Sequence, residues 1–142
     1  MQDLFDLLRE LALPPADYAV FGSGPLAIRN IISAPNDLDV ICRGAAWEKV
    51  LAIGAWDYDE QYGDSLIILH GGKLSFGTRW AIGDFDTDEL IDNSELIDEL
   101  PFVQLENVVK YKLVRASPRD LQHLEALEES EFSICAMPGA SQ

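Results

Sequence analysis

Two aspartates separated by one residue follow a glycine-containing turn in the segment FGSGPLAIRNIISAPNDLDVI, residues 21–41. The apolar run around Leu38 and Val40 predicts a buried strand, and side chains two apart on a strand share a face, with Cα atoms roughly 6.5 Å apart. The carboxylates of Asp37 and Asp39 can therefore converge on one hard cation such as Mg²⁺. Leu38 and Val40 are expected to point the opposite way, into the core. The chemistry that this spacing favours is metal-ion binding.

A glycine turn precedes this acidic pair in the sequence. Gly22-Ser23-Gly24 interrupts an apolar strand at residues 18–21, and Pro25 suits the first turn of a helix. Backbone N–H groups at the start of a helix favour phosphate. A metal-binding pair next to a phosphate-binding turn suits phosphoryl or nucleotidyl transfer. On the residues alone, an ordinary strand turn with surface acids remains the alternative.

Context selects this pair, because Asp-x-Asp also occurs at 57/59, 84/86 and 86/88. Only the pair at 37/39 lies in an apolar strand that follows a glycine turn and a helix. The acids between Asp84 and Glu95 have the spacing of a calcium-binding loop, but Glu89 stands where that loop needs a glycine. Asp86 followed by Glu89 favours a capped helix N-terminus instead.

Basic residues are few, yet Lys110, Lys112, Arg115 and Arg119 crowd one stretch of the chain. Lys112 and Arg115 share a face of the helix expected there. These side chains can meet a phosphate group, or they can balance the many surrounding acids. The residues alone leave both interpretations open.

Hydrophobic periodicity predicts a mixed α/β or α+β fold made of strands and helices, with a helical C-terminal end. Helices are expected at residues 3–12, 25–33, 45–53, 87–91, 105–116 and 118–129. Strands are expected at 18–21, 38–42, 56–62, 65–69 and 73–80, with a hairpin across His70-Gly71-Gly72 and a short extended piece at 102–103. Residues 1–130 should form one domain, and residues 131–142 a flexible tail.

Composition limits the functional classes. The chain has 142 residues with 25 acidic and 10 basic side chains, a net charge of −15, and is long enough to bury a core. Such a surface repels phosphate backbones, which makes extended nucleic-acid binding unfavourable. Without a long apolar run or a basic N-terminus, we expect a cytoplasmic protein with no membrane association. Cys42 is expected to be a buried thiol, not part of a disulfide with Cys135.

The order of strand, Gly-Ser turn, helix and Asp-x-Asp on the next strand resembles the signature of the DNA polymerase β-type nucleotidyltransferase superfamily. In particular it resembles the small, minimal nucleotidyltransferase-like proteins. Tyr111-Lys112 and Pro118-Arg119-Asp120 also resemble the helical end of such proteins. The resemblance covers most of residues 18–127.

This resemblance implies a mixed sheet flanked by helices and a specific site. Asp37 and Asp39 would be the catalytic residues and the ligands of Mg²⁺. Gly22 and Ser23 would hold the triphosphate of an NTP, with ATP expected first, and Lys112 would neutralise phosphate charge. The implied reaction is transfer of NMP from the NTP to a hydroxyl acceptor.

One departure from the family pattern concerns the third carboxylate, which the family usually supplies from a later strand. Ser75 stands at the matching place, and a serine is a poor Mg²⁺ ligand and a poor base at neutral pH. Asp84 or Asp86 could replace it if the following loop folds back. The alternative function is therefore a catalytically inactive binding or regulatory module with a protein partner, for example one half of a toxin–antitoxin-type pair. A plain acidic scaffold without a small ligand is a third reading.

Overall fold

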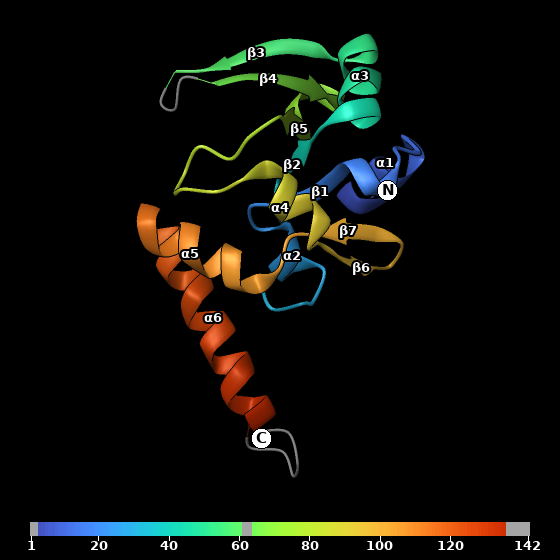
Figure 1. Cartoon of the computed structure of the whole chain (residues 1–142). Helices are drawn as coiled ribbons and strands as arrows, with labels where there is room; N and C mark the ends of the chain where they lie inside the picture. The colour runs from blue at the N-terminus through green and yellow to red at the C-terminus, as the bar shows by residue number, and fades with distance from the viewer. Residues whose placement is uncertain (1–2, 61–63, 136–142) are drawn as a thin grey trace.

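The computed structural model describes residues 3–60 and 64–135, and within them seven strands form one mixed sheet flanked by helices (Figure 1). The strands lie in the order β3-β4-β5-β2-β1-β7-β6. Their bounds are β1 Tyr18–Phe21, β2 Leu38–Cys42, β3 Ala55–Asp59, β4 Asp64–Leu69, β5 Leu74–Gly77, β6 Glu95–Ile97 and β7 Leu100–Phe102. The α-helices are α1 Leu4–Glu10, α2 Gly24–Ala27, α3 Gly44–Ile53, α4 Thr87–Asp92, α5 Leu105–Arg115 and α6 Pro118–Cys135, with 3₁₀ turns at Pro15–Asp17 and His70–Gly72. The predicted mixed α/β class is confirmed.

The register of the central strands determines which ends meet. β1 and β2 are antiparallel with Phe21 opposite Asp39, so the turn after β1 lies beside the start of β2. β2 and β5 are parallel with Asp39 beside Ser75. The glycine turn, the acidic pair and Ser75 therefore lie close together at one end of the central strands.

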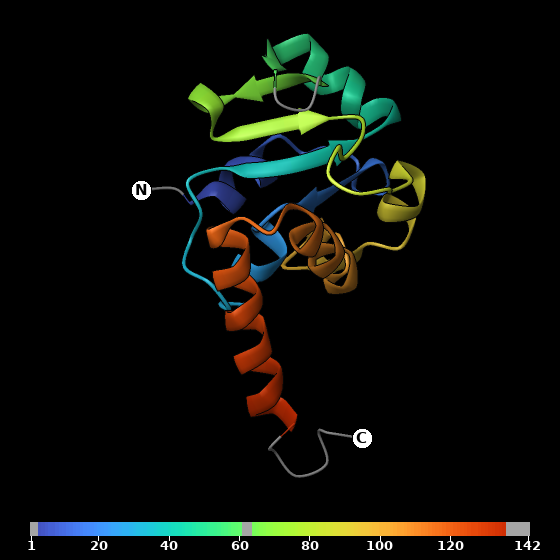
Figure 2. The same cartoon turned by 90° about the vertical axis from the view of Figure 1, so that its left-hand side faces the viewer.

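Alternating side chains on the strands build one hydrophobic cluster on each face of the sheet. Leu38 and Val40 belong to the cluster that α1 and α3 cover, as predicted. Phe21 and Ile41 belong to the other cluster, together with Tyr111 and further residues of α2, α4, α5 and α6. Figure 2 shows α5 and α6 on the side of the sheet away from α3. Asp39 lies between Leu38 and Val40 and so faces the side of the second cluster.

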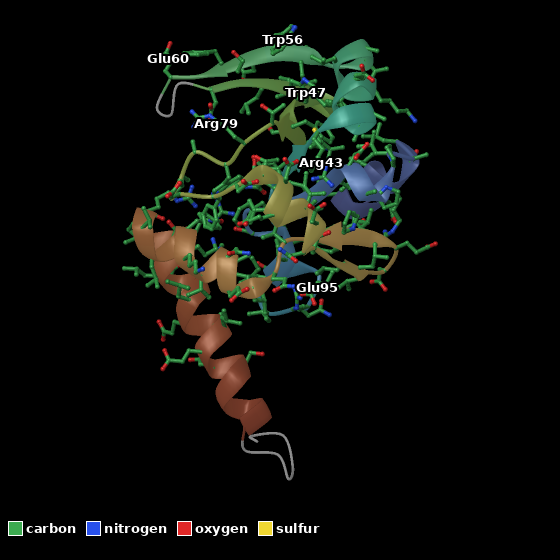
Figure 3. All side chains as sticks on the ribbon, in the orientation of Figure 1. Arg43, Trp47, Trp56, Glu60, Arg79 and Glu95 are labelled. Carbon is green, nitrogen blue, oxygen red and sulfur yellow. The ribbon has the colours of Figure 1, made fainter. Side chains whose placement is uncertain are left out.

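The outer end of the sheet is covered on one face by α3. Trp47 of α3 points toward Trp56 of β3, and the two rings meet edge to face with centroids 6.2 Å apart (Figure 3). Trp56 remains 63% exposed. The helix thus covers β3 in part, and the opposite face of β4 and β5 lines the cavity described below.

The structure corrects the predicted extent of several elements. α2 ends at Ala27 and does not continue to residue 33, because Asn30 has a φ of +60° and Ile31 N–H bonds back to Leu26 O. β5 ends at Gly77, short of the predicted residue 80, and the short strand β6 was not predicted. The predicted hairpin between β4 and β5 is confirmed. The expected end of β3 at residues 61–62 lies outside the described residues.

α4 and α6 both begin with side-chain caps, and the one at α4 was predicted. Asp86 accepts a hydrogen bond from Glu89 N–H at 3.2 Å and begins α4, which confirms the capped-helix interpretation of this acidic stretch. Ser117 and Asp120 exchange bonds of 3.1 Å, each backbone N–H donating to the other side chain, at the start of α6.

α6 is longer than predicted. It continues to Cys135, past the expected end near Glu129, so five residues assigned to the tail are helical. Residues 136–142 of the expected tail lie outside the described residues. The helix starts against α5 and then extends away from the sheet (Figures 1 and 2).

Candidate functional site

The glycine turn after β1 is fitted closely to Asp39. Gly22 has a φ of +61°, a conformation that glycine adopts without strain. A Cβ placed on Gly22 would lie 2.9 Å from Asp39 Oδ2, which is too close for a real side chain. Glycine is thus required here both by the backbone and by the carboxylate beside it.

One cavity of about 210 Å³ is lined by charged side chains at this end of the central strands. Its lining consists of two carboxylates, two arginines, a serine and three ring-bearing residues: Asp37, Asp39, Arg115, Arg119, Ser23, Pro35, Trp80 and Tyr111. Three of the residues selected from the sequence, Ser23, Asp37 and Asp39, are therefore brought together. We call this space the phosphate-side cavity, after the phosphate contact that was one of the two roles predicted for the basic stretch that contributes Arg115 and Arg119.

The two carboxylates differ in their surroundings. Asp37 is exposed just before β2, whereas Asp39 is partly buried within it. Burial and, to a lesser extent, the charge of Asp37 raise the pKa of Asp39 to about 6, against the opposing effect of Arg115, Lys112 and Arg119. A cation bound beside Asp39 would therefore stabilise its ionised carboxylate.

Lys112 lies behind the cavity and does not line it. Its side chain is fully buried, and Nζ donates to Asp120 Oδ1 at 3.2 Å and to Ser23 Oγ at 3.3 Å. Burial lowers the pKa of Lys112, and the bond to Asp120 opposes that effect. In this structure Lys112 therefore contacts Ser23 and Asp120 instead of reaching the cavity wall. Arg115 and Arg119 are the basic side chains in the cavity wall.

Asp120 connects the two C-terminal helices. It is fully buried and accepts hydrogen bonds from Arg115 Nε at 2.7 Å and Arg115 Nη2 at 2.8 Å, as well as from Lys112. Burial alone would raise its pKa, but the hydrogen bonds from Arg115 and Ser117 outweigh burial and hold the pKa below the ordinary value. Asp120 is therefore ionised and fixes the guanidinium of Arg115 at the cavity.

His123 completes this buried network from the second turn of α6. Its Nδ1 lies 3.0 Å from Lys112 Nζ and 3.4 Å from Ser23 Oγ. Burial and the neighbouring charges of Lys112 and Arg119 lower the pKa of His123 to about 4, so the ring is neutral at pH 7. Because an ammonium group can only donate, Nδ1 accepts from Lys112 and the ring proton lies on Nε2.

Sequence reasoning missed Trp80, Tyr111 and His123 as parts of this site. Trp80 stacks on Phe21 with centroids 4.5 Å apart, and Tyr111 meets both rings edge to face. His123 lies 100 residues from its neighbour Ser23. The adjacency of Tyr111 to Lys112 was the one local signal that could have indicated a member of this group.

The place of a third carboxylate is occupied by Ser75, which pairs with Asp39 in the parallel register of β2 and β5. Asp84 and Asp86 do not complete the acidic pair, because they line a different cavity and Asp86 caps α4. Within residues 3–60 and 64–135, no group of three or more His, Cys, Asp or Glu side chains is arranged to hold a metal ion.

A Mg²⁺ ion is nevertheless compatible with the residues present. Mg²⁺ in phosphate-transfer sites is commonly bound by one or two carboxylates, while substrate phosphates and water supply the other ligands. Asp37 and Asp39 provide two such oxygen ligands in a cavity that also contains Arg119. The pair therefore fits a metal that arrives with a phosphate, and does not resemble a site that encloses a metal with protein ligands alone.

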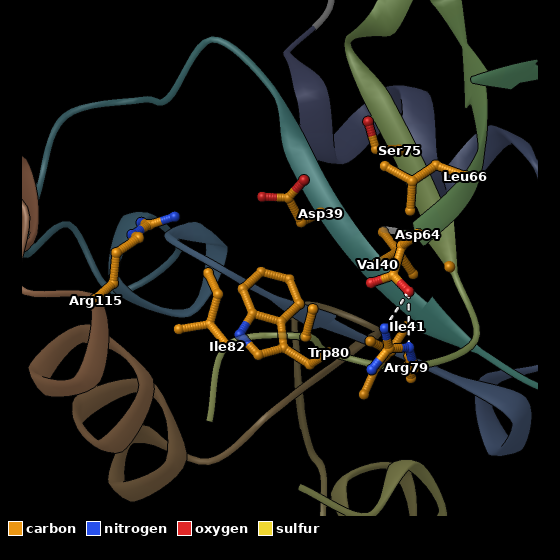
Figure 4. A pocket seen from close by; sticks show the side chains of 12 residues that line it. Asp39, Val40, Ile41, Asp64, Leu66, Ser75, Arg79, Trp80, Ile82 and Arg115 are labelled. Atoms are coloured by element: carbon orange, nitrogen blue, oxygen red, sulfur yellow. Dashed lines mark hydrogen bonds and ion pairs between the residues drawn. The ribbon is translucent and has the colours of Figure 1, made fainter. Parts of the chain in front are cut away.

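A second cavity of about 130 Å³ shares Asp39, Trp80 and Arg115 with the first (Figure 4). It extends over β5 and β4, where Ser75, Gly77 and Leu66 face it. Figure 4 shows Asp39 and Ser75 at one end and the ion pair between Asp64 and Arg79 at the other. We call this space the sheet-side cavity.

Comparisons of the chain with protein-family models, with curated proteins and with solved structures found no match. The structure itself establishes a mixed α/β fold with a seven-stranded sheet. In the part of the chain that it describes, none of the helices combines the length and apolar character that a membrane crossing requires.

Proposed function

We propose that this chain is a Mg²⁺-dependent nucleotidyltransferase that transfers NMP from an NTP to a hydroxyl acceptor. The observation that carries the proposal is the joint lining of the phosphate-side cavity by Ser23, the pair Asp37 and Asp39, and the arginines Arg115 and Arg119. Carboxylates suited to a hard cation and guanidinium groups suited to phosphate thus share one wall. A metal–nucleotide complex is the ligand class that needs both.

Each side chain has a distinct role in this proposal. Asp37 and Asp39 hold Mg²⁺, which when bound offsets phosphate charge and polarises the reacting phosphoryl group. Arg119 and Arg115 contact the phosphates, and Asp120 holds Arg115 in place. Ser23, together with the backbone of the turn, lies against the triphosphate.

The reaction is a displacement at the α-phosphorus of the NTP. The acceptor hydroxyl oxygen forms a bond to that phosphorus while the bond to the bridging oxygen of the β-phosphate breaks. Pyrophosphate leaves with the electron pair, and the hydroxyl proton passes to water.

A thermal-shift experiment tests nucleotide binding. Mg-ATP at 100 times its Kd should stabilise the wild type by about 2.7 kcal/mol, which corresponds to a rise in melting temperature of roughly 5–10 °C for a chain of this size. The shift should disappear in Asp37→Asn and Asp39→Asn and persist in Asp57→Asn, an exposed carboxylate on β3. Each variant is compared with and without nucleotide. No shift with any of the four NTPs would contradict the proposal.

One observation favours a second function, a nucleotide-binding module without turnover. Ser75 lies beside Asp39 at the place where a third carboxylate would help to activate the acceptor. This reading predicts that Mg-NTP binds, that a protein partner binds tightly, and that no product forms in cell extract. Appearance of labelled nucleotide on an acceptor, and its loss in Asp39→Asn, would rule out the silent module.

A further inference from the structure

The sheet-side cavity is lined by Asp39 but not by Asp37, and it differs from the phosphate-side cavity in its other charges. Arg79 is paired with Asp64 at 2.6 Å, and Arg115 is held by Asp120. Both arginines of the sheet-side cavity therefore already face a carboxylate. Arg119, which lines only the phosphate-side cavity, has no ion pair among the side chains that the structure describes. Because the two cavities share Arg115, Arg119 is the cation that distinguishes the phosphate-side cavity as a place for a phosphate group.

The remaining walls of the sheet-side cavity are largely apolar. Leu66 rises from β4, while Trp80 and Ile82 come from the segment after β5. Ser75 places a hydroxyl next to Asp39 on the same face of the sheet, because the two residues are paired in register. An occupant would therefore have an apolar body against Leu66 and Trp80 and a polar end directed toward Asp39.

The size of this cavity restricts the occupant. Its volume of about 130 Å³ is close to that of an engineered protein cavity of about 150 Å³ that binds benzene. One six-membered ring or a branched chain of similar size would fill it. The cavity is not enclosed, so the rest of a larger acceptor would extend out of it.

We propose that the sheet-side cavity binds the acceptor, and that the part of the acceptor next to the hydroxyl is a single ring or a chain of similar size without phosphate. The proposal rests on the proposed function, since it gives the second substrate of that reaction a place beside Asp39. The acceptor hydroxyl oxygen attacks the α-phosphorus from this cavity, pyrophosphate leaves on the phosphate side, and the hydroxyl proton passes to water.

A small fluorinated alcohol tests this assignment without knowledge of the natural acceptor. 4-Fluorophenol is titrated into the full chain and followed by ¹⁹F NMR, with 4-fluorophenyl phosphate as the charged counterpart. The phenol should bind at least about tenfold more tightly than its phosphate ester at this site, which corresponds to about 1.4 kcal/mol. Ser75→Leu, which fills the cavity, should weaken binding at least about tenfold. Ser65→Leu is the matched control, since Ser65 is exposed on β4 and lies outside both cavities.

Two measurements on the wild type keep the test independent of how the variants fold. Intermolecular NOEs should connect the bound phenol with methyl groups of Leu66 and Ile82. Mn²⁺-ATP in place of Mg²⁺-ATP should broaden the ¹⁹F signal of the bound phenol, because the paramagnetic ion would lie at the neighbouring carboxylates. This broadening should be absent in Asp37→Asn.

The possible failures are distinguishable. If Mg-ATP stabilises the chain but the phenol shows no NOE to Leu66 or Ile82, the acceptor assignment is wrong and the proposed function stands. If the phenol binds there but no NTP stabilises the chain, the proposed function fails, and the acceptor assignment fails with it. Equal binding of the phenol to Ser75→Leu and Ser65→Leu, or preferred binding of the phosphate ester in this cavity, would also overturn the assignment.

Discussion

Neutralising Asp39 should stabilise the metal-free protein at neutral pH, even though it removes a proposed metal ligand. Burial raises the pKa of this carboxyl from 3.8 to about 6, and Asp37 adds like charge nearby. The ionised carboxylate is therefore less favourable in the folded chain than in the unfolded chain. Asp39→Asn keeps the shape of the side chain and removes the charge.

The magnitude and its sign follow from proton linkage. A carboxyl with a raised pKa keeps its proton to a higher pH in the folded state than in the unfolded state. The contribution of Asp39 to the free energy of unfolding is therefore most favourable below pH 4 and becomes less favourable as the pH rises toward 6. A difference of about two pH units corresponds to about 3 kcal/mol at pH values above the folded pKa. Asp39→Asn should therefore gain about 3 kcal/mol at pH 7.5 and almost nothing at pH 4, or roughly 6–12 °C in melting temperature at neutral pH.

The assay is urea unfolding of the wild type and Asp39→Asn in EDTA at a series of pH values between 4 and 8. The quantity of interest is the difference in the free energy of unfolding between the two proteins, because titration of all other groups then cancels. Asp57→Asn serves as control for the loss of one acid from a strongly acidic chain, since Asp57 is exposed on the outer strand β3.

The reasoning would be refuted by a difference that does not grow with pH. Equal stability of the two proteins at pH 7.5 would show that the site already accommodates the charge of Asp39. A similar gain in Asp57→Asn would show that relief of the overall negative charge, and not the local environment of Asp39, is responsible.

Three further outcomes test the surroundings of the acidic pair. Gly22→Ala should reduce the free energy of unfolding by about 1–2 kcal/mol, because alanine is strained at a φ of +61° and its Cβ would meet Asp39; unchanged urea unfolding would contradict the described turn. Asp120→Asn should cost about 3–5 kcal/mol, because the charge of Lys112 would remain buried without its partner; a loss below about 1 kcal/mol would show that the ion pair is not buried. Ser75→Asp should make the melting temperature more sensitive to Mg²⁺ alone, because a third carboxylate would lie beside Asp39 in register, and an unchanged Mg²⁺ response would argue against a metal at this edge.

The acidic part of the site, which contains Asp39 and the glycine turn, could be predicted from the sequence because its residues are close together in the chain. A strand, a glycine turn and a second strand of fixed period place Asp39 and Gly22 together through one hairpin-like pairing. The alternation of Leu38, Asp39 and Val40 then determines which side chain faces the cavity. The only error in this segment was the length of α2, where the left-handed conformation of Asn30 ends the helix early.

The positive half could not be predicted to the same degree. Ser23 and Lys112 are 89 residues apart, and their contact depends on how α5 and α6 pack on the sheet. Helical periodicity placed Lys112 and Arg115 on one face but could not show that Asp120 would bury the lysine. Because of this packing, Lys112 lies behind Ser23, and Arg115 lines the cavity wall where Lys112 was expected.

The balance of charge at the site suggests why metal and nucleotide would need to bind together. Three carboxylates, Asp37, Asp39 and Asp120, lie among three basic side chains, Lys112, Arg115 and Arg119, while His123 is neutral. A triphosphate alone would add several negative charges beside the acidic pair, on a chain whose net charge is already −15. A divalent cation alone would find only two carboxylates, one of them exposed. On the proposed function each ligand supplies the charge that the other lacks, so the affinity for either should rise when the other is present.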